Sequence, residues 1–139
     1  MPHGHETFEH TADIGIRAWG NNFPEVFEEA AQALFNVIVD LKTVTPRQEF
    51  KVKLTAESEE ELLLKWLQEL LFISETKHIF FSKFKVSSVT PKQFIAEAYG
   101  EPADLQKHSF GREVKAITRH QFRLVSGPPR YLAEVILDI

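Results

Sequence analysis

The order of the hydrophobic patterns along the chain constrains its fold more than any other feature. Residues 6–20 are typical of a strand, a turn around Thr11 to Asp13 and a second strand with alternating side chains. Residues 48–56 alternate apolar with polar side chains, as a half-buried strand does. A segment with helical spacing follows each of them, at 21–40 and 58–76, and the remaining patterns are all of strand type, at 78–89, 93–101, 113–125 and 131–137. This order matches neither a repeating βαβ unit nor an all-β sandwich. We therefore predict an α+β fold, with two helices packed on one face of a mainly antiparallel β-sheet, in a single domain over residues 1–139.

Both predicted helices carry their own start signals. Pro24 falls in the first turn of the first helix, where its missing amide is harmless, and acidic residues follow it. Ser58 and Glu61 have capping-box spacing at the start of the second helix. The side chains predicted to face the core recur at helical intervals: Val26, Phe27, Ala30, Leu34, Val37 and Ile38, then Leu62, Leu63, Trp66, Leu67, Leu70 and Leu71.

Composition excludes several classes of protein. The 139 residues include no cysteine, which rules out disulfides, thiolate nucleophiles and cysteine-ligated metals. A formal net charge of −4 argues against stable direct binding to nucleic acid through bulk electrostatics. No apolar run approaches the roughly 20 residues that span a bilayer, and the first residues lack the pattern of a secretory signal. We expect a cytoplasmic protein with no membrane association.

The last strand pattern, YLAEVIL, is followed directly by Asp138 and Ile139. Should that strand pack into a sheet, the Asp138 carboxylate and the terminal carboxylate of Ile139 are held close together. Two like charges about 4 Å apart repel by roughly 4 kcal/mol at an effective dielectric constant near 20. A shared proton, a cationic side chain or a metal ion would relieve this repulsion, and an all-oxygen pair suits a hard cation such as Ca²⁺, Mg²⁺ or Mn²⁺. The alternative is a terminus whose two carboxylates point into water.

A second candidate is the stretch HTADIG, in which His10 and Asp13 flank a predicted turn. Gly15 relaxes the backbone just after it, so that the turn can direct a carboxylate into a shared pocket. The competing interpretation is an Asx-type turn, in which Asp13 only accepts hydrogen bonds from nearby backbone amides.

A third candidate is EVKAITRHQFRL, where Lys115 stands among apolar neighbours and His120 follows on the opposite face. Lys115 could bind a phosphate or pair with the carboxylates, although a solvated strand face also accounts for a single lysine. Glycine-rich phosphate loops, G-x-S-x-G elbows and H-E-x-x-H motifs do not occur in the sequence.

Taken together, HTADIGIRAWG at residues 10–20, EVKAITRH at 113–120 and AEVILDI at 133–139 resemble the archease family. The resemblance covers essentially the whole chain. It implies a small α+β protein that assists the RNA ligase joining a 2′,3′-cyclic phosphate or 3′-phosphate end to a 5′-hydroxyl, as in tRNA splicing and RNA repair. Family members are thought to promote guanylylation of a histidine on that ligase and so to allow multiple turnovers. The resemblance therefore implies a cofactor protein rather than an enzyme.

The resemblance also implies roles for individual residues. Asp13, Asp138 and the terminal carboxylate of Ile139 would be the metal-binding carboxylates, and we expect the chain to stop there because its end is a ligand. The cation would be Ca²⁺ or Mg²⁺/Mn²⁺. Lys115 would be a functional contact at the same tip.

Two other functions stay open at this point. A metal-dependent phosphoester hydrolase could use the same carboxylates, with His10 or His120 as the only evident bases. A chaperone-like modulator of a tRNA methyltransferase, an earlier proposal for the family, would need no metal.

Overall fold

The computed structural model describes residues 3–10 and 13–139. Its elements follow one another in the predicted order, with one strand pattern divided in two. They are β1 (Gly4–His10), β2 (Asp13–Gly20), α1 (Phe23–Ile38), the short 3₁₀ turn η1 (Leu41–Thr43), β3 (Gln48–Leu54), α2 (Glu59–Lys77), β4 (Ile79–Thr90), β5 (Gln93–Pro102), β6 (Ala116–Ile117), β7 (Arg123–Val125) and β8 (Tyr131–Asp138).

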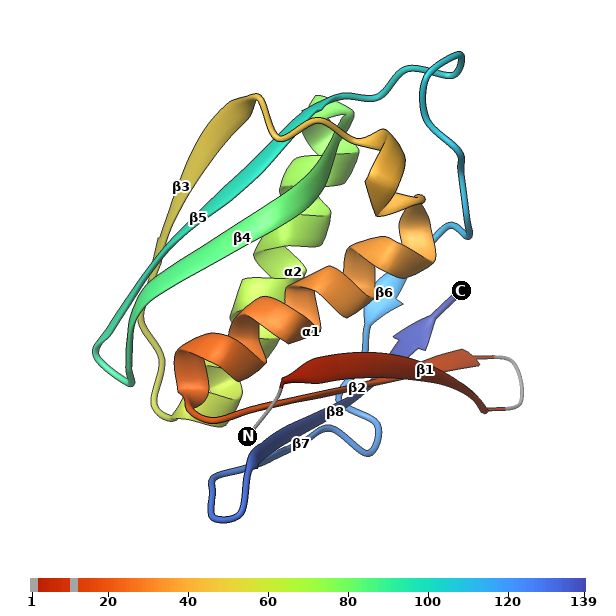
Figure 1. The fold of residues 1–139 in the computed structure, drawn as a ribbon. Coiled ribbons are helices and arrows are strands. Elements are labelled where there is room, and N and C mark those ends of the chain that lie inside the picture. The colour runs from red at the N-terminus through yellow and green to blue at the C-terminus, as the bar shows by residue number, and fades with distance from the viewer. Residues whose placement is uncertain (1–2, 11–12) are drawn as a thin grey trace.

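The strands form two antiparallel sheets, with the helices between them (Figure 1). One sheet has the order β1-β2-β8-β6, with β7 also paired to β8, and the other has the order β3-β5-β4. The α+β class is thus confirmed, while the single sheet we expected is divided in two. The reason lies in α1, which buries Ala31, Ala33 and Phe35 in addition to the predicted stripe, so its apolar surface is too wide for one sheet to cover.

Both helices begin as the sequence indicates. The Asn22 side chain caps α1 by accepting a hydrogen bond from the Glu25 amide at 2.9 Å. Ser58 caps α2 by accepting one from the Glu61 amide at 3.2 Å. These caps satisfy amides that have no partner within the helix, and so they fix where each helix starts.

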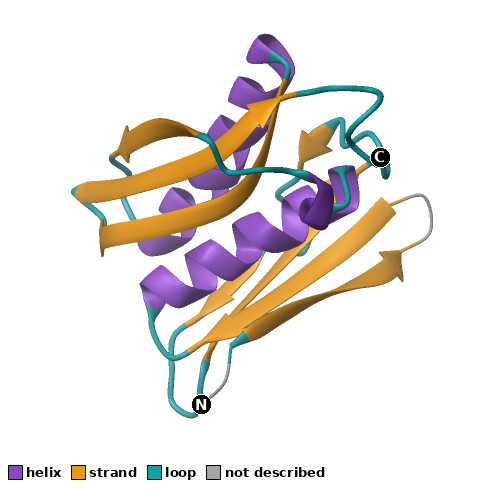
Figure 2. Ribbon diagram, turned by 45° about the horizontal axis from the view of Figure 1, so that its top comes forward, coloured by secondary structure: helices purple, strands orange, loops and turns teal. Residues whose placement is uncertain are grey.

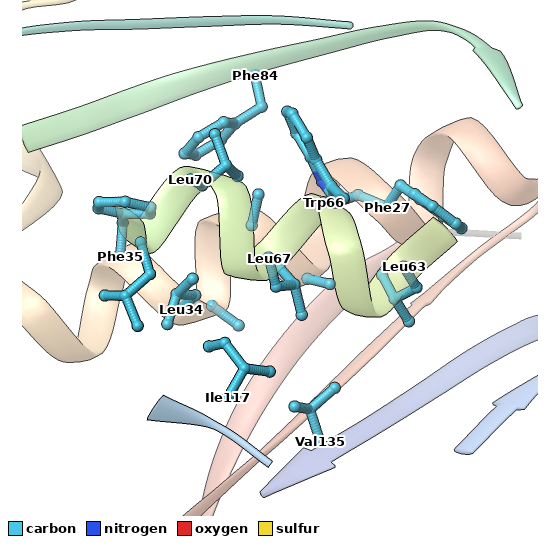
Figure 3. Close-up of a cluster of buried hydrophobic side chains, with 14 of the residues drawn as sticks. Phe27, Leu34, Phe35, Leu63, Trp66, Leu67, Leu70, Phe84, Ile117 and Val135 are labelled. Carbon is cyan, nitrogen blue, oxygen red and sulfur yellow. The ribbon is translucent and has the colours of Figure 1, made fainter. Parts of the chain in front are cut away.

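The core lies along both helices and reaches from one sheet to the other. Figure 3 shows Phe84 of β4 on one side of the helices and Ile117 and Val135, from β6 and β8, on the other. Trp66 at its centre is fully buried and donates its indole N–H to the backbone carbonyl of Phe27 at 3.0 Å. The two helices and both sheets therefore share one packed interior.

The strand predicted over residues 113–125 is the one element that the structure corrects. Only Ala116–Ile117 and Arg123–Val125 are strands, and both pair with β8. The segment between β6 and β7 has more residues than the part of β8 that lies between their partners. It therefore leaves the sheet in a turn that includes Gln121 at φ 52°. Local alternation could not reveal this, because it records side-chain polarity and not how many residues the partner strand accommodates.

No helix in the described part of the chain is both long enough and apolar enough to cross a membrane.

Candidate functional site

Strand register brings the early and the final predicted site residues together. Asp13, the first residue of β2, lies directly opposite Asp138 near the end of β8. On the other side of β8, Ala116 lies opposite Asp138, and the Lys115 amide donates to the Asp138 carbonyl at 2.7 Å. Figure 1 shows the C-terminus at this end of the sheet, beside β6. We call the group Asp13, Asp138 and the carboxylate of residue 139 the carboxylate tip.

Core packing sets this register. Ile14 and Ile16 of β2 pair with Leu137 and Val135 of β8, and Ile16, Val135 and Leu137 are buried against the helices. A slip of one residue would turn this apolar set to the opposite face of the sheet. The hydrophobic side chains therefore hold the two aspartates opposite each other.

Two like charges face each other where Asp13 pairs with Asp138. Side chains directly opposite each other in antiparallel strands leave the same face, with Cβ atoms about 4.5–5.5 Å apart, and like charges there are destabilising. Asp138 is exposed and Asp13 half-buried, so water screens part of the repulsion. A cation placed between the two carboxylates would remove it.

The donor set suits a hard cation. Its atoms are all oxygen, as Ca²⁺, Mg²⁺ and Mn²⁺ prefer. Within residues 3–10 and 13–139, no group of three or more His, Cys, Asp or Glu side chains is arranged to hold a metal ion. Among the described side chains, the tip therefore has the two carboxylates of Asp13 and Asp138, and the carboxylate of residue 139 stays a predicted ligand.

A contrast within β8 sets Asp138 apart. Glu134, four residues earlier on the same face, receives Arg17 and Arg123, each at 2.8 Å. The hydrogen bonds that the Arg17 guanidinium donates to the carboxylates of Glu6 and Glu134 raise the pKa of Arg17 above its ordinary value. Among the described residues, the Asp138 side chain makes no such ion pair. The acidic charge of β8 is thus neutralised in the middle of the sheet and left uncompensated at its end.

The remaining predicted contacts fall at different distances from the tip. Lys115 is joined to it through its own amide, and its side chain is exposed. His10 pairs with Asp13 across the β1–β2 hairpin, but its side chain lies outside the described part of the structure. His120 is exposed in the turn after β6, beyond Thr118, whose amide already bonds to Ile136. Strand register thus brings Lys115 to Asp138 and carries His120 away along β8.

Sequence reasoning missed a buried carboxylate near the end of β5, just before the loop that leads to Lys115. Glu101 is 1% exposed and accepts hydrogen bonds from the Thr45 amide, Arg47 Nε, Lys107 Nζ and the His108 ring at 2.8–3.0 Å. The Asp104 amide donates to Nδ1 of His108, so Nε2 carries the proton that bonds to Glu101.

Burial alone would raise the pKa of Glu101. The hydrogen bonds from Lys107, the Thr45 amide and His108 outweigh burial and lower this pKa to about 2. No sequence motif indicates this cluster, because the partners of Glu101 come from two loops, one before it in the sequence and one after it.

Comparison with known families and chains agrees with this architecture. The model of the Archease protein family (MTH1598/TM1083) matches residues 5–139. The protein archease of Sulfurisphaera tokodaii is 40% identical over 136 residues, covering 96% of this chain and 97% of its own. The protein archease of Pyrococcus abyssi is 41% identical over 138 residues, with 96% and 97% covered.

Two solved structures share the fold. The solution structure of Methanobacterium thermoautotrophicum protein 1598 superposes with a TM-score of 0.85 at 40% identity, covering 98% of this chain and 99% of that one. The crystal structure of a Thermotoga maritima archease, described there as a possible chaperone, gives a TM-score of 0.66 at 18% identity, with 96% of both chains covered. At that identity the second likeness concerns the fold alone. The family match over nearly the whole chain and the 40% identity to several of its members show that this protein belongs to the archease family.

Proposed function

We propose that this protein is a non-catalytic cofactor protein for the RNA ligase that joins 3′-phosphate and 5′-hydroxyl ends. It would promote guanylylation of the ligase and its multiple turnover in tRNA splicing and RNA repair. The observation that carries the proposal is the pairing of Asp13 with Asp138, which gathers carboxylates at one exposed end of a sheet. Family membership supports the choice of partner.

In this proposal the carboxylate tip holds a divalent cation, Ca²⁺ or Mg²⁺/Mn²⁺. Asp13, Asp138 and the carboxylate of residue 139 would supply its oxygen ligands. A bound divalent cation stabilises negative charge that builds up on phosphate oxygens. The protein's own contribution is positional: β2 and β8 present the carboxylates at the end of a rigid sheet, and the exposed Lys115 adds a positive charge beside them for a phosphate or an acidic side chain of the ligase.

The direct experiment measures guanylylation of the purified ligase with and without this protein, in the presence of each cation. We expect stimulation by the wild-type protein, and its loss with Asp138→Ala or with one residue added after Ile139. Glu57→Gln, which changes an exposed acid ahead of α2, serves as the matched control and should stimulate normally. Normal stimulation by both tip variants would end the proposal.

A second candidate function is that of a chaperone-like modulator of a tRNA methyltransferase. The Thermotoga maritima relative is described as a possible chaperone, which concerns that protein and names no methyltransferase. Stimulation of a methyltransferase that persists in a chelator would support it against the ligase role. Phosphoester turnover by the purified protein alone would instead support a metal-dependent hydrolase.

A further inference from the structure

A pocket of about 640 Å³ opens between the C-terminal ends of α1 and α2 and the segment that leads into β6. This volume falls within the roughly 300–1,000 Å³ typical of ligand-binding clefts. Apolar side chains make up much of the lining, while charged side chains of both signs reach it from the rim. Those used below are Leu71, Glu75, Phe110, Arg112, Glu113 and Lys115.

The wall formed by residues 110–115 is fixed at both ends. The amides of Gly111 and Arg112 donate to the last carbonyls of α1, those of Ile38 and Val37, at 2.8 Å each. At the other end the Lys115 amide donates to Asp138. A segment held this way loses little conformational freedom when something binds against it, so the pocket is preorganised.

Phe110 stands on this wall with 46% of its surface exposed. Its ring packs against Phe80 at a centroid distance of 5.4 Å, and Phe80 packs edge-on against His108 at 5.3 Å. His108 is in turn held by Glu101. Phe72, Leu105 and Val125 are exposed as well, but of these four described side chains only Phe110 lines the pocket, so an occupant of the pocket would cover it.

The pocket borders the carboxylate tip through one residue, Lys115. Lys115 lines the pocket and bonds through its amide to Asp138, so a partner that meets the tip also lies next to the pocket mouth. Figure 2 shows the C-terminus beside the loops at this end of the molecule. One partner surface can therefore engage both features.

The charges on the rim indicate what kind of occupant fits. Arg112 and Lys115 are exposed and make no ion pair among the described residues, and the same holds for Glu75 and Glu113. A free polyphosphate would meet two carboxylates as well as the two cations. A peptide segment with an apolar side chain and charges of both signs would satisfy the floor and the rim together.

We propose that this pocket receives a short protruding segment of the RNA ligase, whose apolar anchor side chain packs against Phe110 while the carboxylate tip engages the ligase separately. The inference rests on the proposed function for the identity of the partner. It adds a second contact, which supplies affinity and orientation rather than metal chemistry. Phe110 is then an anchoring residue for the complex and not a catalytic one.

The test measures the dissociation constant between the purified ligase and the full-length protein by biolayer interferometry. Phe110→Ala should weaken binding at least tenfold, as removal of a central aromatic anchor does. Leu105→Ala is the matched control, because Leu105 precedes it in the same loop, is 82% exposed and lies outside the pocket lining. It should bind within twofold of the wild type. Phe110→Ala can also weaken binding by destabilising the fold, which a lower melting temperature would reveal. Glu75→Lys, a change at an exposed residue on the opposite wall of the pocket, then gives a second measurement of binding.

The outcomes separate the two proposals. Binding of Phe110→Ala and Glu75→Lys within twofold of the wild type overturns the docking inference, even where the wild type stimulates guanylylation. Binding without stimulation by the wild type overturns the proposed function and leaves the docking comparison valid. Shifts of the Phe110 and Lys115 NMR signals on addition of GTP alone would assign the pocket to a nucleotide, and a dimer dissolved by Phe110→Ala would assign it to a second copy. Either result overturns the inference.

Discussion

Replacing Glu101 with glutamine tests the buried cluster that anchors the loop between β5 and β6. The variant keeps the size of the side chain, but it removes the charge and sets an amide donor against the donors of Arg47, Lys107 and His108. A carboxyl with a pKa of about 2 in the folded protein and 4.5 when unfolded contributes about 3 kcal/mol at neutral pH. Hydrogen bonds to charged groups, worth about 1.5–3 kcal/mol each, lead to a loss of the same order.

The sign of the pH dependence follows from the lowered pKa. Because the folded protein binds the Glu101 proton more weakly than the unfolded chain, the stabilisation is complete above pH 4.5 and is lost as the pH falls towards 2. Urea unfolding at pH 7 should therefore show Glu101→Gln about 3 kcal/mol less stable than the wild type, and the difference should shrink between pH 5 and pH 2. A loss below about 1 kcal/mol at pH 7, or a difference that does not change with pH, would refute this account of the cluster.

Three further changes test the tip, the pocket wall and the core. Asp138→Asn should raise the free energy of unfolding in chelator by up to about 1 kcal/mol, because it removes a like charge opposite Asp13. The proposed cation site also predicts that Ca²⁺ raises the Tm of the wild type but not that of this variant. Thermal melts of the variant with and without Ca²⁺ that match those of the wild type would contradict both expectations. Gly111→Ala should lower the free energy of unfolding by about 1–3 kcal/mol, because the added Cβ would come within 2.2 Å of the Val37 carbonyl oxygen. An unchanged midpoint of urea unfolding would show that the pocket wall is not tightly held. Trp66→Phe removes the indole N–H that bonds to the Phe27 carbonyl and leaves a cavity in the core, so it should cost at least about 1 kcal/mol. Calorimetry that shows no loss of stability would contradict this account of the core.

Local sequence signals predict much of this fold. The caps at Ser58 and Asn22 and the apolar spacing of both helices have causes within a few residues of themselves, so the helices begin where the sequence indicates. The pairing of Asp13 with Asp138 can also be predicted from the sequence, by the alternation of side chains in β2 and β8 together with the family resemblance. The reason is that the core-facing residues of the two strands set their register.

Other features depend on contacts between distant segments, which periodicity does not record. The division into two sheets follows from the width of the apolar surface of α1, and the break in residues 113–125 follows from pairing both halves with one strand. Glu101 becomes a buried ion-pair centre only when two loops close over it, and the pocket exists only because residues 110–115 are tied to α1 and to Asp138. Side-chain patterns specify which face of an element is buried, whereas the identity of the surface that buries it emerges only when the whole chain packs.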